Sequence, residues 1–568
     1  MAADKDRTVR LRDVLRWATP ILGPDRPFFT LAIIYGAGIS LLSLATPISV
    51  QMLINSVANQ ALPAPLFTLS GVLFVLLMLS AVMSAMRAYL MEIFGQRFFA
   101  RMVAEITLRA VHARNPFFGD ERKVDLFDRY FEVMNIQKAM PSLLIGLFTI
   151  LLQSGVGFVV TSFYHPFFLG FNLIFILVTW LIWRVWSRGA MTSRIELSHA
   201  KYETAHWLES VGSSNGFYKS NRHLDFAIDR SEAKTASYIA AYRRHVRYSL
   251  TQTTAFLVLY AVASAGLLAM GGWLVIQSQL SIGQLVAAEL ILSSIFYGAA
   301  QLGPYLDTFY DLVAALEELH LLNDIPQETP GSVGAIAQAR SDLAFADVRL
   351  DDMRFDLAIA HGSRLIASAD DDVQRAFSLL LKRDRQPAGG FVTLGGADLA
   401  TLDAYDLRGD VIVLDRPMIV ESSIIDYLKL ASPDDSPTAM MAAVRAASLD
   451  RRIGRLPEGL HTVLSQTGWP LSVPETMRLK FAGALLAEPK ILVLSPLFDM
   501  MPRRDLDRMI AAIGPSRTTM IYFTNREDPP ELDGYYWIGR TAQSRVADQA
   551  GFDALRFAQR EASDVAAR

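Results

Sequence analysis

Six long apolar runs between residues 28 and 309 are the feature that most constrains how this chain folds. Each run approaches the ~20 residues that an α-helix needs to cross the hydrocarbon core of a bilayer. A soluble helix would keep a polar face along its length, whereas these runs carry almost no charge. The sequence therefore predicts six membrane-spanning helices, at residues 28–57, 66–86, 141–164, 167–183, 250–276 and 282–309.

The segments between the runs differ in charge, and this difference predicts their side of the membrane. The short segments contain no Lys or Arg, whereas the two long ones, after the second and fourth runs, are rich in both. Because basic connectors stay in the cytoplasm, both termini and both long connectors are predicted to be cytoplasmic. The charged start of the chain lacks the apolar core of a cleaved signal peptide. Residues 10–22 mix apolar and basic positions and favour a helix on the membrane surface over a cytosolic tail.

The amino-acid composition excludes several classes of function. The formal net charge of −3 gives no overall signal for nucleic-acid binding, so no nucleic-acid partner is expected. The chain contains no cysteine, which excludes disulfides, thiolate catalysis and cysteine-ligated zinc or iron–sulfur centres.

A second part of the chain follows the apolar runs. Leucines recur at helical spacing in residues 312–324, and residues 326–341 are polar and rich in Pro and Gly. Beyond them, short apolar strands at 410–414, at 490–494 and ending at Phe523 alternate with helices, which favours a mostly parallel sheet. We therefore predict an N-terminal segment at 1–26, a six-span domain at 27–325, a linker at 326–341 and an α/β domain at 342–568.

Motifs in this second part resemble the nucleotide-binding domain of ABC transporters. Residues 389–399 (GGFVTLGGADL) match a hairpin motif of that family, and Leu456, Pro457 and Gly459 match its L-P-x-G segment. Residues 484–494 match the helix end and Walker B strand that follow. Two long cytoplasmic connectors are also the layout of the type IV, exporter-type, membrane domain. The resemblance thus covers essentially the whole chain and implies an α-helical six-span domain followed by an α/β ABC-ATPase-like domain.

The resemblance also implies two coupling helices, which are short cytoplasmic helices that contact the nucleotide-binding domains. By position, the first falls between Asp125 and Tyr130 and the second between Val211 and Tyr218. The alternative is that both stretches are ordinary solvated helix turns.

ATP hydrolysis in this family depends on a Gly-rich phosphate loop with its Lys, on Mg²⁺-binding Ser/Thr and Asp side chains, and on a carboxylate beside the attacking water. The resemblance places other residue types at these positions. They are Ala369, Gln374, Arg375 and Ala376 in the Walker A loop, Asp415 for the Q-loop Gln, Leu471, Ser472, Val473, Pro474 and Glu475 for the LSGGQ signature, Ser495 and Pro496 for the Walker B Asp and catalytic Glu, and Asn525 for the H-loop His. The D-loop Asp falls near Pro502, with Asp499 as a shifted candidate.

From these differences we expect no catalytic residue, no binding of ATP or Mg²⁺, and no enzymatic activity in this chain. Asp370, Asp371 and Asp372 would repel a triphosphate, and they also suit a plain helix N-terminus. Three adjacent carboxylates at one helix start cannot all face one ion, so no metal site is predicted.

Glu289 is the exceptional residue of the sixth apolar run. A carboxylate among Val286, Ala287, Ala288, Leu290 and Ile291 is costly in a bilayer and is often functional there. We consider it a candidate for the translocation path. The alternative is a Glu close enough to the outer interface to stay hydrated.

The favoured hypothesis is a catalytically inactive half of an ABC exporter-type complex, with a degenerate nucleotide-binding domain. A second half-transporter, in a heterodimer or else a homodimer, would supply hydrolysis. The alternative is an ATP-independent membrane scaffold or regulator that kept the exporter architecture. Either protein would be integral to the lipid bilayer, in the bacterial inner membrane. The sequence identifies no substrate, and it leaves a periplasmic adaptor open.

Overall fold

The structure is a computed structural model that describes residues 9–60, 64–114, 124–328, 340–432, 436–514 and 517–566. The chain forms two compact units, the first running to Gln327 and the second beginning at Glu328. Each unit is described by itself.

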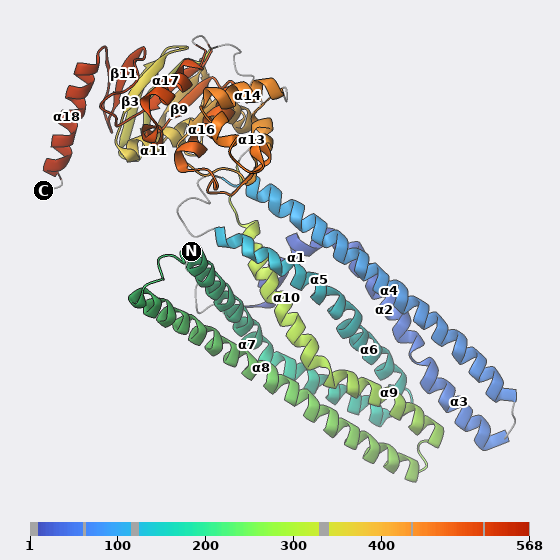
Figure 1. Ribbon diagram of the computed structural model, residues 1–568. Coiled ribbons are helices and arrows are strands. Elements are labelled where there is room, and N and C mark those ends of the chain that lie inside the picture. Colours follow the sequence, from blue (N-terminus) through green and yellow to red (C-terminus); the bar gives the residue numbers. More distant parts are fainter. Residues whose placement is uncertain are drawn as a thin grey trace. The chain divides into compact units, whose positions relative to one another are not determined.

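The first unit is built from helices (Figure 1). Six helical segments among the described residues are long and apolar enough to cross a membrane, which agrees with the six predicted spans. Helices α4 and α7 have 48 residues each and α8 has 56, so all three exceed the ~20 residues that a bilayer requires. The helices of this unit are α1 (Leu11–Leu22), α2 (Arg26–Leu42), α3 (Ala45–Gln60), α4 (Ala64–Val111), α5 (Glu132–Ser142), α6 (Phe148–Ser162), α7 (Pro166–Ser213), α8 (Asn221–Ile276), α9 (Ile282–Ala300) and α10 (Leu302–Asn323).

Proline divides the first and the sixth apolar runs, each of which the sequence predicted as one helix. The first run contains α2 and α3, and the sixth contains α9 and the start of α10. Pro47 and Pro304 are each the third residue of the later helix. Proline lacks the N–H that would bond four residues back and clashes with that carbonyl, so the earlier helix ends.

Hydrogen bonds from Arg101 to a buried carboxylate and to a backbone carbonyl hold the N-terminal part of the first unit in place. The Asp25 carboxylate is fully buried, and Arg101 donates to it at 2.8 Å (Nη2 to Oδ2). The same Arg101 nitrogen donates to the Ile21 carbonyl at 2.6 Å. These contacts hold the end of α1 against α4, while Leu15 on α1 stays 65% exposed. An exposed leucine next to basic residues agrees with a helix on a membrane surface.

The second unit contains two main sheets. A four-stranded antiparallel sheet has the order β2-β1-β4-β5, and a six-stranded sheet has the order β12-β11-β3-β10-β9-β6. In the larger sheet all neighbours are parallel except β12, which confirms the predicted α/β fold with a mostly parallel sheet. The strands are β1 (Leu343–Leu350), β2 (Met353–Ile359), β3 (Arg364–Ser368), β4 (Gly389–Leu394), β5 (Ala397–Asp398), β6 (Val411–Leu414), β7 (Ser422–Ser423), β8 (Val463–Leu464), β9 (Ile491–Leu494), β10 (Thr519–Phe523), β11 (Gly534–Ile538) and β12 (Gln543–Val546).

Helices cover both faces of the larger sheet. Strand β10 shows why, because Ile521 and Phe523 pack into the core under α11, while Met520 and Tyr522 pack into a second core with α16 and α17. The helices of this unit are α11 (Asp371–Leu381), α12 (Ala404–Asp410), α13 (Ile424–Ala431), α14 (Pro437–Ala446), α15 (Asp450–Ile453), α16 (Val473–Ala487), α17 (Arg503–Ala511) and α18 (Gln549–Ala566).

Candidate functional site

The connection between β3 and α11 occupies the Walker A position. It consists of Ala369 and Asp370 alone, because α11 already begins at Asp371. The sequence-based alignment treated residues 369–376 as a loop, so that assignment is wrong from Asp371 onward. Asp371 and Asp372 lie in the first helical turn, where negative charge is favourable.

An arginine of the same chain lies against this helix start. Arg540, beside the turn between β11 and β12, forms ion pairs with both Asp352 and Asp372. Gln374 and Ala376 are buried within α11. A glycine loop that surrounds phosphates needs several residues with free backbone N–H groups. The two-residue connection and the carboxylate–arginine bridge do not fit a triphosphate held in that way.

Two other expected positions lie at the carboxyl ends of neighbouring strands. Asp415 follows β6, and its two carboxylate oxygens accept from Lys382 Nζ at 3.0 Å each. Ser495 follows β9, is 3% exposed, and its Oγ has no hydrogen-bond partner among the described residues. Pro496 begins the short 3₁₀ helix η6 (Pro496–Met500).

The segment at the signature position forms a helix start. Ser472 caps α16 and Glu475 accepts from the Ser472 N–H at 2.9 Å, which completes a capping box. Pro474 lies in the first turn, where its missing N–H costs nothing. The S-x-x-E spacing of Ser472 and Glu475 is a known helix-start signal, and sequence reasoning overlooked it.

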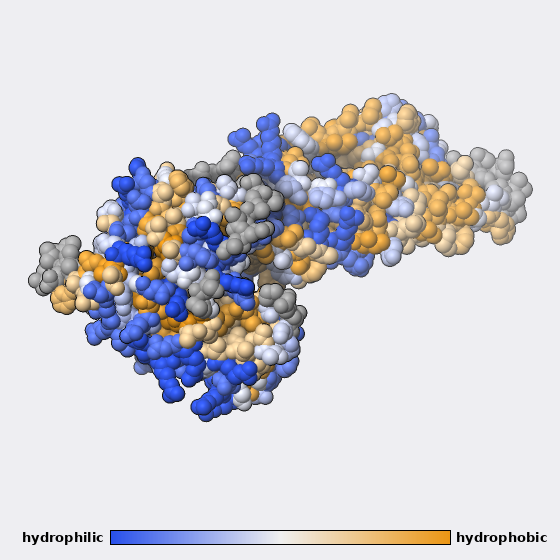
Figure 2. Space-filling view, turned by 90° about the horizontal axis from the view of Figure 1, so that it is seen from above, coloured by the Kyte–Doolittle hydropathy of each residue, from blue (hydrophilic) through white to orange (hydrophobic). Residues whose placement is uncertain are grey.

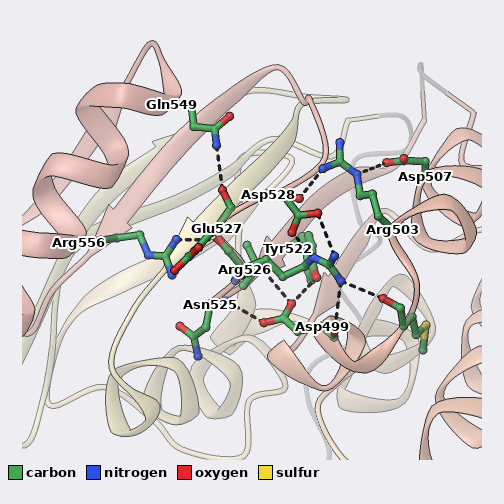
Figure 3. A network of polar contacts seen from close by, with 12 residues as sticks. Asp499, Arg503, Asp507, Tyr522, Asn525, Arg526, Glu527, Asp528, Gln549 and Arg556 are labelled. Atoms are coloured by element: carbon green, nitrogen blue, oxygen red, sulfur yellow. Dashed lines mark hydrogen bonds and ion pairs between the residues drawn. The ribbon is translucent and has the colours of Figure 1, made fainter.

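Asp499 is the centre of a polar network at the ends of β9 and β10 (Figure 3). Its Oδ1 accepts from the Tyr522 hydroxyl and, at 2.7 Å, from the Thr524 hydroxyl. Its Oδ2 accepts from the Asn525 backbone N–H at 2.8 Å. Burial, together with the Asp499 carboxylate, raises the pKa of Tyr522. The structure thus joins the shifted D-loop candidate to the H-loop position through the backbone of Asn525, whose side chain is exposed.

Arg526 extends this network. Its guanidinium binds both oxygens of Asp528, at 3.0 and 3.1 Å, and this pair lowers the pKa of Asp528. The same guanidinium donates to the carbonyls of Asp499 and Met501 at 3.1 and 2.9 Å. The two charge-assisted hydrogen bonds to these carbonyls tie the segment after β10 to η6 and to Met501, which follows it.

The membrane unit contains the other predicted site residues. Glu289 lies within α9, partly buried, and accepts from Ser293 Oγ at 2.8 Å, while its Oε2 is buried without a partner among the described residues. Tyr130 lies in the 3₁₀ helix η2 (Val124–Phe131), whereas the side chain of Asp125 is outside the described residues. Val211 lies near the end of α7, and Tyr218 lies in the turn before α8.

A cluster of His199, Glu317 and Glu318 brings potential ligand atoms within 4.8 Å of one another. Sequence reasoning did not find it, because 118 residues separate His199 from Glu317. Glu318 is already paired with Arg129 and accepts from Ser198 Oγ at 2.9 Å. We therefore read the cluster as an internal ion-pair network.

Comparisons with known proteins agree with this fold. Residues 29–299 match the family model of the ABC transporter transmembrane region. The alpha-hemolysin translocation ATP-binding protein HlyB of Escherichia coli is 24% identical over 492 residues, which are 84% of this chain and 69% of that protein. The leukotoxin translocation ATP-binding protein LktB of Mannheimia glucosida is 23% identical over 491 residues, with the same shares. A solved structure of a bacterial Atm1-family ABC exporter with ATP bound superimposes with a TM-score of 0.77 at 17% identity, covering 92% of this chain and 95% of the other.

These comparisons overturn two sequence-based predictions. We expected no enzymatic activity and no ATP or Mg²⁺, yet the relatives that align over 84% of the chain are ATP-binding proteins. The similar solved structure also carries ATP. Both predictions are wrong by this evidence. Since the β3–α11 connection does not fit a glycine-loop phosphate site, we derive no catalytic step through ATP.

The architecture and the comparisons lead to one conclusion. Residues 29–299 match the family model of the ABC transporter transmembrane region, and the chain as a whole has the fold of an ABC exporter.

Proposed function

We propose that this chain is one half of an ATP-using export complex of the bacterial inner membrane. The observation that carries the proposal is the alignment of 84% of this chain, which includes residues of both units, with translocation ATP-binding proteins. The apolar helices would supply half of the path through the bilayer, and the α/β unit would couple that path to nucleotide.

A second half-transporter completes the proposed complex. One chain supplies six spans and one α/β unit, and exporter-type complexes use two of each. The partner is either a second ABC chain or a second copy of this one. Both termini lie in the cytoplasm in this proposal, since both long connectors between the spans are rich in Lys and Arg. Glu289 would face the translocation path, where a function in transport would offset the free-energy cost of placing a carboxylate in a membrane span.

Purification from the native membrane tests this function. The tagged chain should co-purify with a second half-transporter or with itself, and the complex should bind Mg²⁺-ATP saturably and hydrolyse it. A periplasmic adaptor would appear in the same mass-spectrometric identification. A complex that binds no nucleotide at millimolar concentration would contradict the proposal. The relatives named above translocate a hemolysin and a leukotoxin, and we do not transfer those substrates to this chain.

A further inference from the structure

Two adjacent carboxylates of α10 are bonded to both helical elements that carry the predicted coupling segments. Glu318 is fully buried, pairs with Arg129 of η2 and accepts from Ser198 Oγ of α7 at 2.9 Å. Glu317 Oε2 lies 3.1 Å from His199 Nε2 of α7. The first predicted coupling segment lies in η2, and the end of α7 runs into the second. One turn of α10 is therefore attached to both segments.

A third carboxylate, Glu132, extends this network to α5. Glu132 is 3% exposed, accepts from the Tyr202 hydroxyl of α7 at 2.7 Å and pairs with Lys201. Arg129 and Lys201 are permanent cations, so a protonated His199 brings the network to three cationic groups and three carboxylates. Without that proton the network carries a net negative charge in a partly buried place, where uncompensated charge is costly.

Among these side chains, His199 is the one that ordinarily changes charge near neutral pH. The charged groups that face its imidazole are Glu317 and Glu318 of α10, the latter at 3.9 Å, and Arg129 of η2. Burial lowers the pKa of His199, but the hydrogen bond to Glu317 and the two carboxylate charges outweigh burial and raise this pKa above its ordinary value. Burial raises the pKa of Tyr202, so its hydroxyl stays neutral over the same range.

This network lies beyond the apolar part of α7. His199 follows the predicted run that ends at residue 183 by 16 residues, which corresponds to about 24 Å at 1.5 Å per residue. Figure 2 shows hydrophilic patches beside the hydrophobic stretches on the surface of the unit that contains it. In the proposed topology the basic connectors are cytoplasmic, so His199 responds to the pH of the cytoplasm.

We propose that Glu317 and Glu318 join the two coupling segments through α10, and that protonation of His199 tightens this junction. A raised histidine pKa contributes stability that is complete below the unfolded value of about 6.5 and is lost as pH rises through the folded pKa. The junction is therefore tight in mild acid and loose in alkali. Its role in transport rests on the export function proposed above, whereas its response to pH does not.

The distance between two spin labels on the purified full-length chain measures this junction. Because the chain has no cysteine, Phe131→Cys at the end of η2 and Leu208→Cys in α7 can be labelled alone. The two native side chains are 59% and 60% exposed, so the labels replace no core contact. Pulsed electron paramagnetic resonance gives the distance distribution at about pH 6 and about pH 9, on either side of the ordinary histidine pKa. EDTA in every sample removes adventitious metal ions.

Two substitutions at one position fix the charge in opposite ways. His199→Lys keeps a positive charge at both pH values, and His199→Gln removes it at both. The matched control is His223→Gln in α8, because the exposed His223 imidazole bonds to the Phe217 carbonyl at 2.7 Å and not to a carboxylate.

In the wild type, the share of longer distances should rise about two- to fivefold from the lower to the higher pH, the range for one partly exposed ion pair. His199→Lys should keep the short distances at both pH values, and His199→Gln should show the longer ones at both. His223→Gln should respond as the wild type does. Circular dichroism and thermal unfolding verify that each variant folds.

Identical distance distributions of the wild type at the two pH values would overturn the proposal. So would a full wild-type response in folded His199→Gln, because another group would then be responsible. The measurement needs neither ATP nor transport. A native complex that binds no nucleotide would therefore refute the export function and leave this result unchanged.

Discussion

At the residue scale, Asp499 illustrates how one carboxylate joins two chain segments. Its hydrogen bonds come from Tyr522, Thr524 and the backbone of Asn525, all at the end of β10, whereas Asp499 itself belongs to η6. A buried hydroxyl that loses its acceptor keeps the cost of desolvation.

We predict that Asp499→Ala lowers the free energy of unfolding of the second unit by about 1–3 kcal/mol, because Tyr522 is left without its acceptor. Thermal or urea unfolding measures the change. The control is Asp507→Ala on α17, whose exposed ion pair with Arg503 spans one helical turn and should cost under about 0.5 kcal/mol. Equal effects of the two substitutions would show that the Asp499 network contributes nothing special.

Glu475 gives a prediction that depends on pH. Burial alone would raise its pKa, but the Ser472 hydrogen bonds and the Arg452 guanidinium, 3.2 Å away, outweigh burial and leave the pKa below its ordinary value. A lowered carboxyl pKa contributes stability that is present above the unfolded pKa and is lost as pH falls through the folded pKa.

We therefore expect the wild type to be more stable than Glu475→Gln at neutral pH, and this advantage to disappear as the pH falls below about 4. Glutamine keeps an oxygen for the Ser472 N–H but cannot ionise, so the comparison isolates the charge. The measurement is the thermal midpoint as a function of pH. A difference that is constant from neutral to acidic pH would contradict this account.

At the element scale, the contact between the third apolar segment and α10 depends on one glycine. Gly146 lies in the π-helical turn η3 (Leu143–Leu147) between α5 and α6. A Cβ there would lie 2.1 Å from Cε1 of Tyr305, so the helices approach closely only because the side chain is absent.

Gly146→Val should destabilise the membrane unit by about 1–3 kcal/mol through overpacking. Adding Tyr305→Ala should recover part of the loss, because the ring that clashes is then gone. Gly170→Val in α7 is the control, since its added Cβ meets no atom within 4 Å. Thermal unfolding in detergent measures all three variants. No rescue by Tyr305→Ala would show that the destabilisation has another source.

At the scale of the whole molecule, α8 sets the topology. Its 56 residues span about 84 Å at 1.5 Å per residue, far more than the ~30 Å hydrocarbon core, and it contains an apolar stretch suited to a bilayer, so we expect its ends on opposite sides of the membrane. Arg222 lies at its start, and Gln279 follows its end.

A cysteine at Arg222 should react with an impermeant thiol reagent only from the cytoplasm, and one at Gln279 only from outside. The chain has no cysteine of its own, so the unsubstituted protein is the blank. Labelling of both positions from the same side would contradict the assignment of the spans.

The failed prediction about ATP belongs to this same scale. It rested on single positions such as Arg375, Ser495 and Asn525, each judged against a motif. The comparisons weigh 492 aligned residues, and these indicate relatives that bind ATP. A motif describes one way in which a loop binds phosphate, whereas the alignment with relatives compares 84% of the chain.

The sequence by itself determined the spans, the parallel strands and the hairpin whose turn at Gly395 and Gly396 has positive φ at both residues. These features follow from local periodicity and backbone preference, which nearby residues fix. Tertiary structure alone decided the ion pair between Arg540 and Asp372, which are 168 residues apart, and the close approach of Tyr305 to Gly146. Packing brings such distant residues together, and no local pattern of residues encodes that distance.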